Sequence, residues 1–327
     1  YDYPGFQALG SYYEYEGESE PNIFHFPDGN ASIARLLVRN MIPSVATGNS
    51  MEDIVTSKFN YNELDKENNQ ISIRLNSTVI KVAHSQNDLT KNVNISYMRD
   101  GKINTIEAKK CIMACYNNII PYLCPEMPDQ QKIALKNCIR APLVYTNVLI
   151  KNWQSFVNLG IRRAEMPGFL HHNVRLDFPV SMGKYQFSKK PSDPVVIHMQ
   201  SVPGEYGNPS AREQFIAGQR KLLTTPFSEF ERSIRNQLTR LLSKGGFDAS
   251  EDILGITVNR WPHGYAYGYD PETDQVAFDM DSWPPEKQHW VNARKRFGNI
   301  TIASTDSASN AMSEAAIVEA DRAVKDI

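Results

Sequence analysis

The stretch ITIASTDSASNAMSEAAIVEADRAVK, residues 300–325, carries the clearest indication of the fold. Its start, Ile300 to Ala303, is a short apolar run typical of a buried strand. Asp306 follows this run, and the remainder predicts a helix from about Ser309 or Met312 to Lys325. Its small residues are Ala311, Ala315, Ala316, Ala320 and Ala323. A strand, an acid and a helix in this order are typical of the ligand-binding edge of an open α/β sheet.

Asp306 has two interpretations at such an edge. Ligands of open α/β sheets lie beyond the carboxyl ends of the strands, where a helix N-terminus offers free N–H groups and the positive end of its dipole. Asp306 would then accept hydrogen bonds from a sugar-like hydroxyl. Alternatively, Asp306 only caps the helix, whose small residues are simply good helix formers. The pattern alone leaves both interpretations open.

The sequence upstream predicts a helix and a small antiparallel meander. Residues 1–27 have no period and indicate an irregular arm, after which apolar residues at helical spacing predict a helix ending before Pro43. Alternating apolar residues and an Asp100-Gly101 turn predict strands over 71–83, 93–98 and 103–108. The apolar run Cys111–Cys115 predicts a fully buried strand, and 117–123 and 129–138 are expected to be helical.

The middle of the chain predicts a separate lobe. Runs rich in β-formers cover 143–150 and 195–200, and a long helical pattern covers 211–242, broken near Pro226 and closed by two glycines. The chain has 327 residues, which suggests two domains or one two-lobed unit.

Composition excludes several classes of protein. Hydrophobic residues make up 41% and charged residues 22%, which does not fit disorder, collagen or coiled coil. The net charge of -2 gives no field that would gather nucleic acid or an anionic membrane, and no apolar run is long enough for a membrane span. The four cysteines lack metal-finger spacing and are interpreted as buried thiols. His171-His172 has no carboxylate at ligand spacing, so we predict no metal site.

A second informative segment is NRWPHGYAYGY, residues 259–269. Trp261, His263, Tyr265 and Tyr267 could surround an amine, through cation–π attraction or by excluding water, with glycines allowing close backbone approach. The alternative is an aromatic-rich core loop. Motifs for a self-sufficient dinucleotide site, a P-loop, a hydrolase elbow and a zincin are absent from the sequence.

Three stretches resemble the spermidine dehydrogenase-like branch of the FAD-dependent amine oxidases: 24–39, 259–267 and 297–324. The resemblance runs over most of the chain, although 141–254 fits only in the order of its elements. It implies an α/β (mixed α+β) fold, the Rossmann-like FAD-binding fold of the amine oxidases, without the N-terminal glycine-rich βαβ unit. The chain would be the C-terminal part of such a flavoprotein.

The resemblance also implies roles for individual residues. The backbone of Val79 would meet the adenine of FAD, Ala114 would end a strand of the same domain, and Asp306 would hold the ribityl or pyrophosphate part. The amides of Met312 and Ser313 would approach the flavin ring. Tyr265 and Tyr267 would form the aromatic wall for the amine, with Trp261 and His263 as neighbours.

The implied reaction is hydride transfer from a carbon beside a neutral amine, such as spermidine, to the flavin. It strictly demands no acid or base, so no catalytic proton-transfer residue is named. Domains are expected at 1–140 (FAD-binding, first part), 141–258 (substrate lobe) and 259–327 (aromatic segment and C-terminal FAD-binding strand and helix). Relatives with export signals suggest the periplasm, and some relatives also bind haem, which this sequence does not reveal. The alternatives are a non-catalytic fragment or truncated paralogue with a binding role, and a flavin desaturase.

Overall fold

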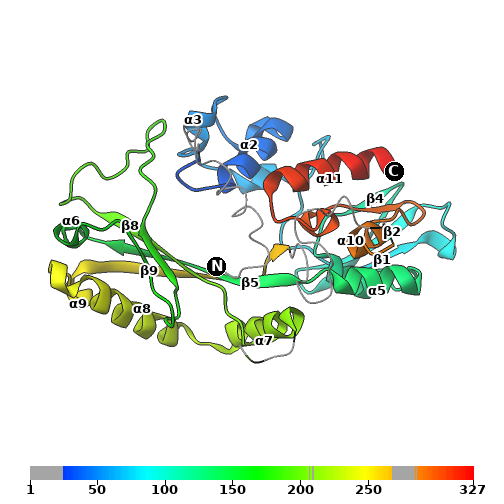
Figure 1. The fold of residues 1–327 in the computed structure, drawn as a ribbon. Coiled ribbons are helices and arrows are strands. Elements are labelled where there is room, and N and C mark those ends of the chain that lie inside the picture. Colours follow the sequence, from blue (N-terminus) through cyan, green and yellow to red (C-terminus); the bar gives the residue numbers. More distant parts are fainter. Residues whose placement is uncertain (1–24, 206, 208–209, 267–283, 285) are drawn as a thin grey trace.

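The computed structural model describes residues 25–205, 207, 210–266, 284 and 286–327. Its strands form a three-stranded meander, a two-stranded parallel pair and a five-stranded sheet. Strand β5 (Arg140–Ile150) leads from the part that holds the first two sheets into the five-stranded sheet (Figure 1). The fold is mixed α/β, as the sequence predicts.

One buried arginine joins the first two described helices. Helix α2 (Ala31–Met41) confirms the predicted helix before Pro43, and α3 (Met51–Ile54) follows it closely. Arg39 is 6% exposed and forms an ion pair with Asp53, which also accepts hydrogen bonds from Ser50 and closes a capping box. A buried arginine needs such a partner, so this pair fixes α3 against α2.

The meander is shorter than its sequence pattern predicts. It consists of β1 (Thr78–His84), β2 (Val93–Arg99) and β3 (Lys102–Ala108), all antiparallel. The expectation of a strand from residue 71 is wrong, because 71–77 form no strand despite their alternating apolar residues. Asn76 has a φ of 52°, in the left-handed region, which interrupts an extended backbone just before β1.

A buried histidine attaches the meander to the C-terminal strand. His84, at the end of β1, places Nδ1 2.6 Å from Oε1 of Glu126, and its Nε2 accepts a hydrogen bond from the backbone of Asn299. Gly298 has a φ of 55°, and a Cβ there would lie 2.5 Å from the His84 ring, so the position requires glycine.

The parallel pair brings together segments from both ends of the chain. Strand β4 (Cys111–Met113) pairs with β10 (Ile300–Ile302). β10 is fully buried, whereas Ile112 in β4 is 39% exposed, so the expectation of a fully buried strand at Cys111 is wrong. The surrounding elements are the 3₁₀ helix η4 (Asn117–Ile119), α4 (Ile120–Leu123), α5 (Asp129–Asn137), α10 (His289–Ala293) and α11 (Ser313–Asp326).

The five-stranded sheet has the order β6-β7-β8-β5-β9 and is antiparallel throughout. The predicted strands and the helical break at Pro226 are confirmed, but the long strand β9 was not foreseen. The strands other than β5 are β6 (Arg163–Glu165), β7 (Asn173–Leu176), β8 (Val195–Ser201) and β9 (Ile253–Ala266). The helices are α6 (Gln154–Leu159), α7 (Ala211–Thr224), α8 (Phe227–Leu242) and α9 (Ala249–Asp252).

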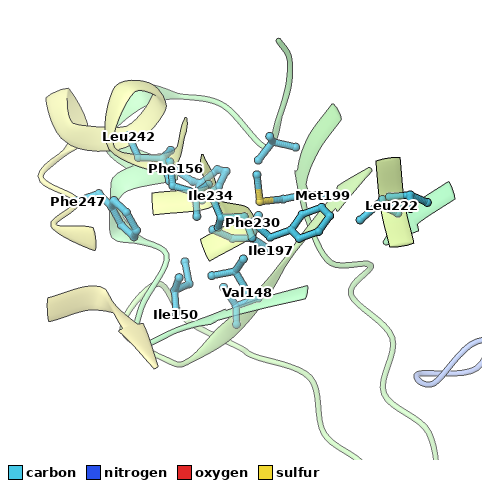
Figure 2. Packing of buried hydrophobic residues seen from close by; sticks show 14 residues of the cluster. Val148, Ile150, Phe156, Ile197, Met199, Leu222, Phe230, Ile234, Leu242 and Phe247 are labelled. Carbon is cyan, nitrogen blue, oxygen red and sulfur yellow. The ribbon is translucent and has the colours of Figure 1, made fainter. Parts of the chain in front are cut away.

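One face of this sheet packs on helices and the other is polar. Val148, Ile150, Ile197 and Met199 point toward Phe230 and the other apolar residues of the helices (Figure 2). The half-buried side chains of Tyr145, Asn147, His198 and Gln200, on β5 and β8, face the other way. These polar side chains are therefore not used in the hydrophobic core and are available to a ligand.

Candidate functional site

Asp306 is buried at the carboxyl ends of β4 and β10. It lies in the 3₁₀ helix η7 (Thr305–Ala308), is 3% exposed, and its Oδ2 accepts a hydrogen bond from the backbone N of Asn117 at 2.9 Å. Ser304 caps η7, and helix α11 begins at Ser313 without a side-chain cap. Asp306 therefore does not cap α11, so the simpler interpretation from the sequence is wrong.

Arg140, which the sequence analysis missed, is the charged partner of Asp306. Its Nε lies 2.8 Å from Oδ1 of Asp306, and its Nη2 donates to Oγ1 of Thr305 at 3.0 Å. Its Nη1 donates to the backbone oxygen of Gly264 at 3.4 Å, and its guanidinium lies 4.6 Å from the ring centre of Tyr116. One side chain thus connects the strand-end acid to the aromatic segment.

Three buried polar atoms of this cluster have no aligned hydrogen-bond partner: Nε of Arg140, Oδ1 of Asp306 and Nδ1 of His263. The Arg140–Asp306 contact is therefore an ion pair without a well-directed hydrogen bond. Burial raises the pKa of Asp306, against the opposing effect of Arg140, and burial lowers the pKa of His263, helped by Arg140. Arg140 and Asp306 are partners as ions, whereas Nδ1 of His263 has no polar partner among the described residues; such buried atoms are rare and point to a bound polar group or water.

The predicted cofactor residues lie in two places. Ala114 is exposed and directly follows β4. Met312 and Ser313 are exposed at the start of α11, which follows β10 and Asp306 in the chain. Asn30, before α2, donates to Oγ of Ser313 at 3.0 Å, which brings two uncapped helix N-termini together. Val79 belongs to β1 of the separate meander and is 38% exposed.

The chemistry of these residues would suit part of a cofactor such as FAD. Nδ1 of His263 and the remaining lone pairs of the Asp306 carboxylate could bind hydroxyl groups. The uncapped start of α11 offers free N–H groups and a positive dipole end to an anionic or electron-rich group. The residues that would hold the cofactor are thus Asp306, Ala114, Met312 and Ser313. Their roles, like that of Val79, stay predictions.

The aromatic segment is a strand, not a loop, and a bulge directs its side chains. Ala141 and Leu143 of β5 pair with Tyr265 and Trp261 of β9, so β9 contains two extra residues there. A Cβ on Gly264 would lie 2.7 Å from Cβ of Leu143, so the bulge requires glycine. Tyr267 lies outside the described residues.

Tyr145 is at the centre of an aromatic cluster formed by Tyr145, His198, Trp261 and Tyr265. The hydroxyls of Tyr145 and Tyr265 are 2.7 Å apart, and the ring of Tyr145 lies 5.0 Å from His198 and 5.1 Å from Trp261. Burial and Tyr265 raise the pKa of Tyr145. His263 is not in this cluster but lies 5.0 Å from Tyr116, near Arg140. The alternation of β5, which puts Tyr145 and Asn147 opposite the buried valines, was the sequence signal that could have found Tyr145.

Other candidate features lie elsewhere or are structural. A hollow of about 670 Å³ beside the meander is lined by polar residues, in which Asp65 pairs with Arg74 and Arg99. The four cysteines are free thiols, two of them buried. Within the described ranges, no group of three or more metal-ligating side chains occurs, and no helix is long and apolar enough to cross a membrane. His171 is buried and His172 is half-buried.

Comparison with solved structures supports the fold. A triple variant of putrescine oxidase matches with a TM-score of 0.51 at 13% identity, over 77% of this chain and 48% of that one. A single variant of the same enzyme matches with a TM-score of 0.50 at 14% identity, over 77% and 48%. Cyclohexylamine oxidase from Brevibacterium oxydans IH-35A gives 0.44 at 11% identity, over 76% and 47%.

The chain thus has the fold found in part of a putrescine oxidase, and it spans about half the length of that enzyme (48%). No protein-family model matches the sequence. No curated protein matches it either.

Proposed function

We propose that the chain is the C-terminal part of an FAD-dependent enzyme that oxidises an amine by hydride transfer to the flavin. The observation that carries the proposal is the position of Arg140. Its side chain contacts Asp306 and Thr305 at the strand ends and also Gly264, next to Tyr265 in the aromatic segment. The two segments with predicted cofactor and substrate roles are therefore held together.

Bound FAD would supply the hydride acceptor. The residues of this chain would bind and orient: Asp306 with the start of α11 on the cofactor side, and Tyr265 and Trp261, together with Tyr267 and His263, on the amine side. Aromatic faces attract an ammonium group and exclude water from the neutral amine that reacts. A polyamine such as spermidine is the substrate that the sequence resemblance suggests, and the periplasm is the location it suggests.

The test uses the full-length protein that contains this chain, loaded with flavin, and follows reduction of the flavin absorbance under anaerobic conditions. We expect amines to reduce the flavin, and Tyr265→Ala to slow reduction at an unchanged flavin content, because orientation is lost while cofactor binding remains. Tyr122→Ala is the matched control, since Tyr122 is 69% exposed on α4. A flavin that no amine reduces would contradict the proposal.

Two other outcomes would favour the alternatives. Reduction by an apolar substrate but by no amine would indicate a flavin desaturase. A protein that binds amines but retains no flavin would indicate a binding module.

A further inference from the structure

Arg175 lies on the polar face of the five-stranded sheet, near the aromatic cluster. It pairs with His198 of β8, which pairs with Asn147 of β5, so these three residues form one row across the sheet. Cross-strand partners lie on the same face, so Arg175 shares the face of Tyr145 and His198. Its charge acts on both of these side chains.

Arg175 is half-buried and makes no ion pair or side-chain hydrogen bond with any residue that the structure describes. Its other cross-strand partner is a second arginine, Arg163 of β6. Like charges directly opposite each other destabilise a sheet. A pair of arginines is therefore costly here unless an anion binds beside it.

The described titratable groups near Arg175 do not neutralise its charge through an ion pair. Nδ1 of His198 lies 2.8 Å from Oδ1 of Asn147, and burial lowers its pKa to about 4, so the ring is neutral at neutral pH. Two acids share this region. Oδ1 of Asp177 accepts from the backbone of Phe178 at 2.9 Å, and Glu165 accepts from Asn173 at 2.7 Å. Neither acid forms an ion pair with Arg175.

We propose that Arg175 binds an anionic group, such as a carboxylate, at the far end of the amine substrate, several carbon atoms from the reacting nitrogen. This inference rests on the proposed function for the identity of the amine. Under the proposed function, the amine nitrogen would lie at Tyr265. From there to Arg175 the path runs past Tyr145 and His198, which are in ring contact. An ω-amino acid matches this order of groups, whereas a polyamine would bring a second ammonium toward a guanidinium.

The first experiment tests the anion site without flavin chemistry. Calorimetry with valerate measures binding to the protein and to Arg175→Gln, with Arg162→Gln as the matched control. Arg162 is exposed and directly precedes Arg163, the first residue of β6. We expect Arg175→Gln to weaken binding by about 10- to 100-fold, as for a charge-assisted hydrogen bond, and added salt to weaken wild-type binding. Equal affinities of the protein and Arg175→Gln would overturn the proposal.

The second experiment compares three amines of equal carbon number as reductants of the flavin-loaded protein: δ-aminovalerate, pentylamine and cadaverine. We expect δ-aminovalerate to be preferred and Arg175→Gln to remove only that preference. Preference for cadaverine would overturn the inference and support the proposed function. No reduction by any amine would overturn the proposed function, and the valerate measurement would still decide whether Arg175 binds an anion.

Discussion

The buried His171 should make the protein sensitive to mild acid. It is fully buried beneath the five-stranded sheet, with Nε2 2.8 Å from Oγ1 of Thr146, its backbone bonded to Gln237, and Nδ1 without a partner. Burial, and secondarily the neighbouring His172, lower its pKa from 6.5 to about 4. The folded interior therefore favours the neutral ring.

Proton linkage gives the direction in which the unfolding free energy changes with pH. The unfolded state binds a proton as the pH falls below 6.5, whereas the folded state resists it until about pH 4, so the stability present above pH 6.5 is lost between these values. At about 1.4 kcal/mol per pKa unit, His171 alone should remove about 2 kcal/mol of unfolding free energy between about pH 7 and pH 5.

Urea unfolding of the protein and of His171→Gln at the two pH values measures this loss. Glutamine can still bond to Thr146 but does not titrate, so the variant should lose about 2 kcal/mol less than the wild type, whatever its stability at neutral pH. His172→Gln, at a half-buried site, is the control, and it should reduce the loss of unfolding free energy by less than His171→Gln does. Equal losses in the wild type and His171→Gln would refute the reasoning.

Three further perturbations test the site. Arg140→Met should cost about 3–5 kcal/mol in urea unfolding, because it leaves Asp306 buried without its charged partner, and Arg140→Met combined with Asp306→Leu should recover part of that loss. Gly264→Ala should cost about 1–3 kcal/mol by crowding the bulge, while Gly255→Ala, on the same strand with open space around it, should cost less; equal costs would contradict the bulge argument. Tyr145→Phe should raise the amine concentration for half-maximal flavin reduction by about 2- to 10-fold with little change in the thermal midpoint, and an unchanged value would remove Tyr145 from the substrate side.

Local patterns predicted the elements whose formation depends on local signals. The helix before Pro43, the Asp100-Gly101 hairpin and the break at Pro226 follow from turn chemistry and periodicity. The same reasoning wrongly extended the first strand of the meander over 71–77, because alternation does not reveal the left-handed Asn76 that interrupts it. It also missed β9, whose glycines and proline are typical of turns and are tolerated here at a bulge and near a sheet edge.

The sequence predicted only part of the candidate site. Asp306 and the start of α11 stand out because strand, acid and helix are adjacent in the chain. Arg140 and Tyr145 belong to no motif, and their importance comes from partners in β9 and η7 that lie more than a hundred residues away. Only the folded structure brings such partners together, so periodicity and spacing could not identify them.

The parallel pair also sets the order in which the protein can fold. The bond from Asn117 to Asp306 joins positions 189 residues apart, and the five-stranded sheet lies between them in the chain. Every strand of that sheet ends by Ala266, so the sheet can form while the later residues are still being synthesised. The pairing of β4 with β10 requires residues 300–302, and among the described strands it closes the longest loop, which carries the highest entropic cost. Until β10 arrives, β4 presents an unpaired parallel edge, and a chaperone that shields such edges would act at this stage.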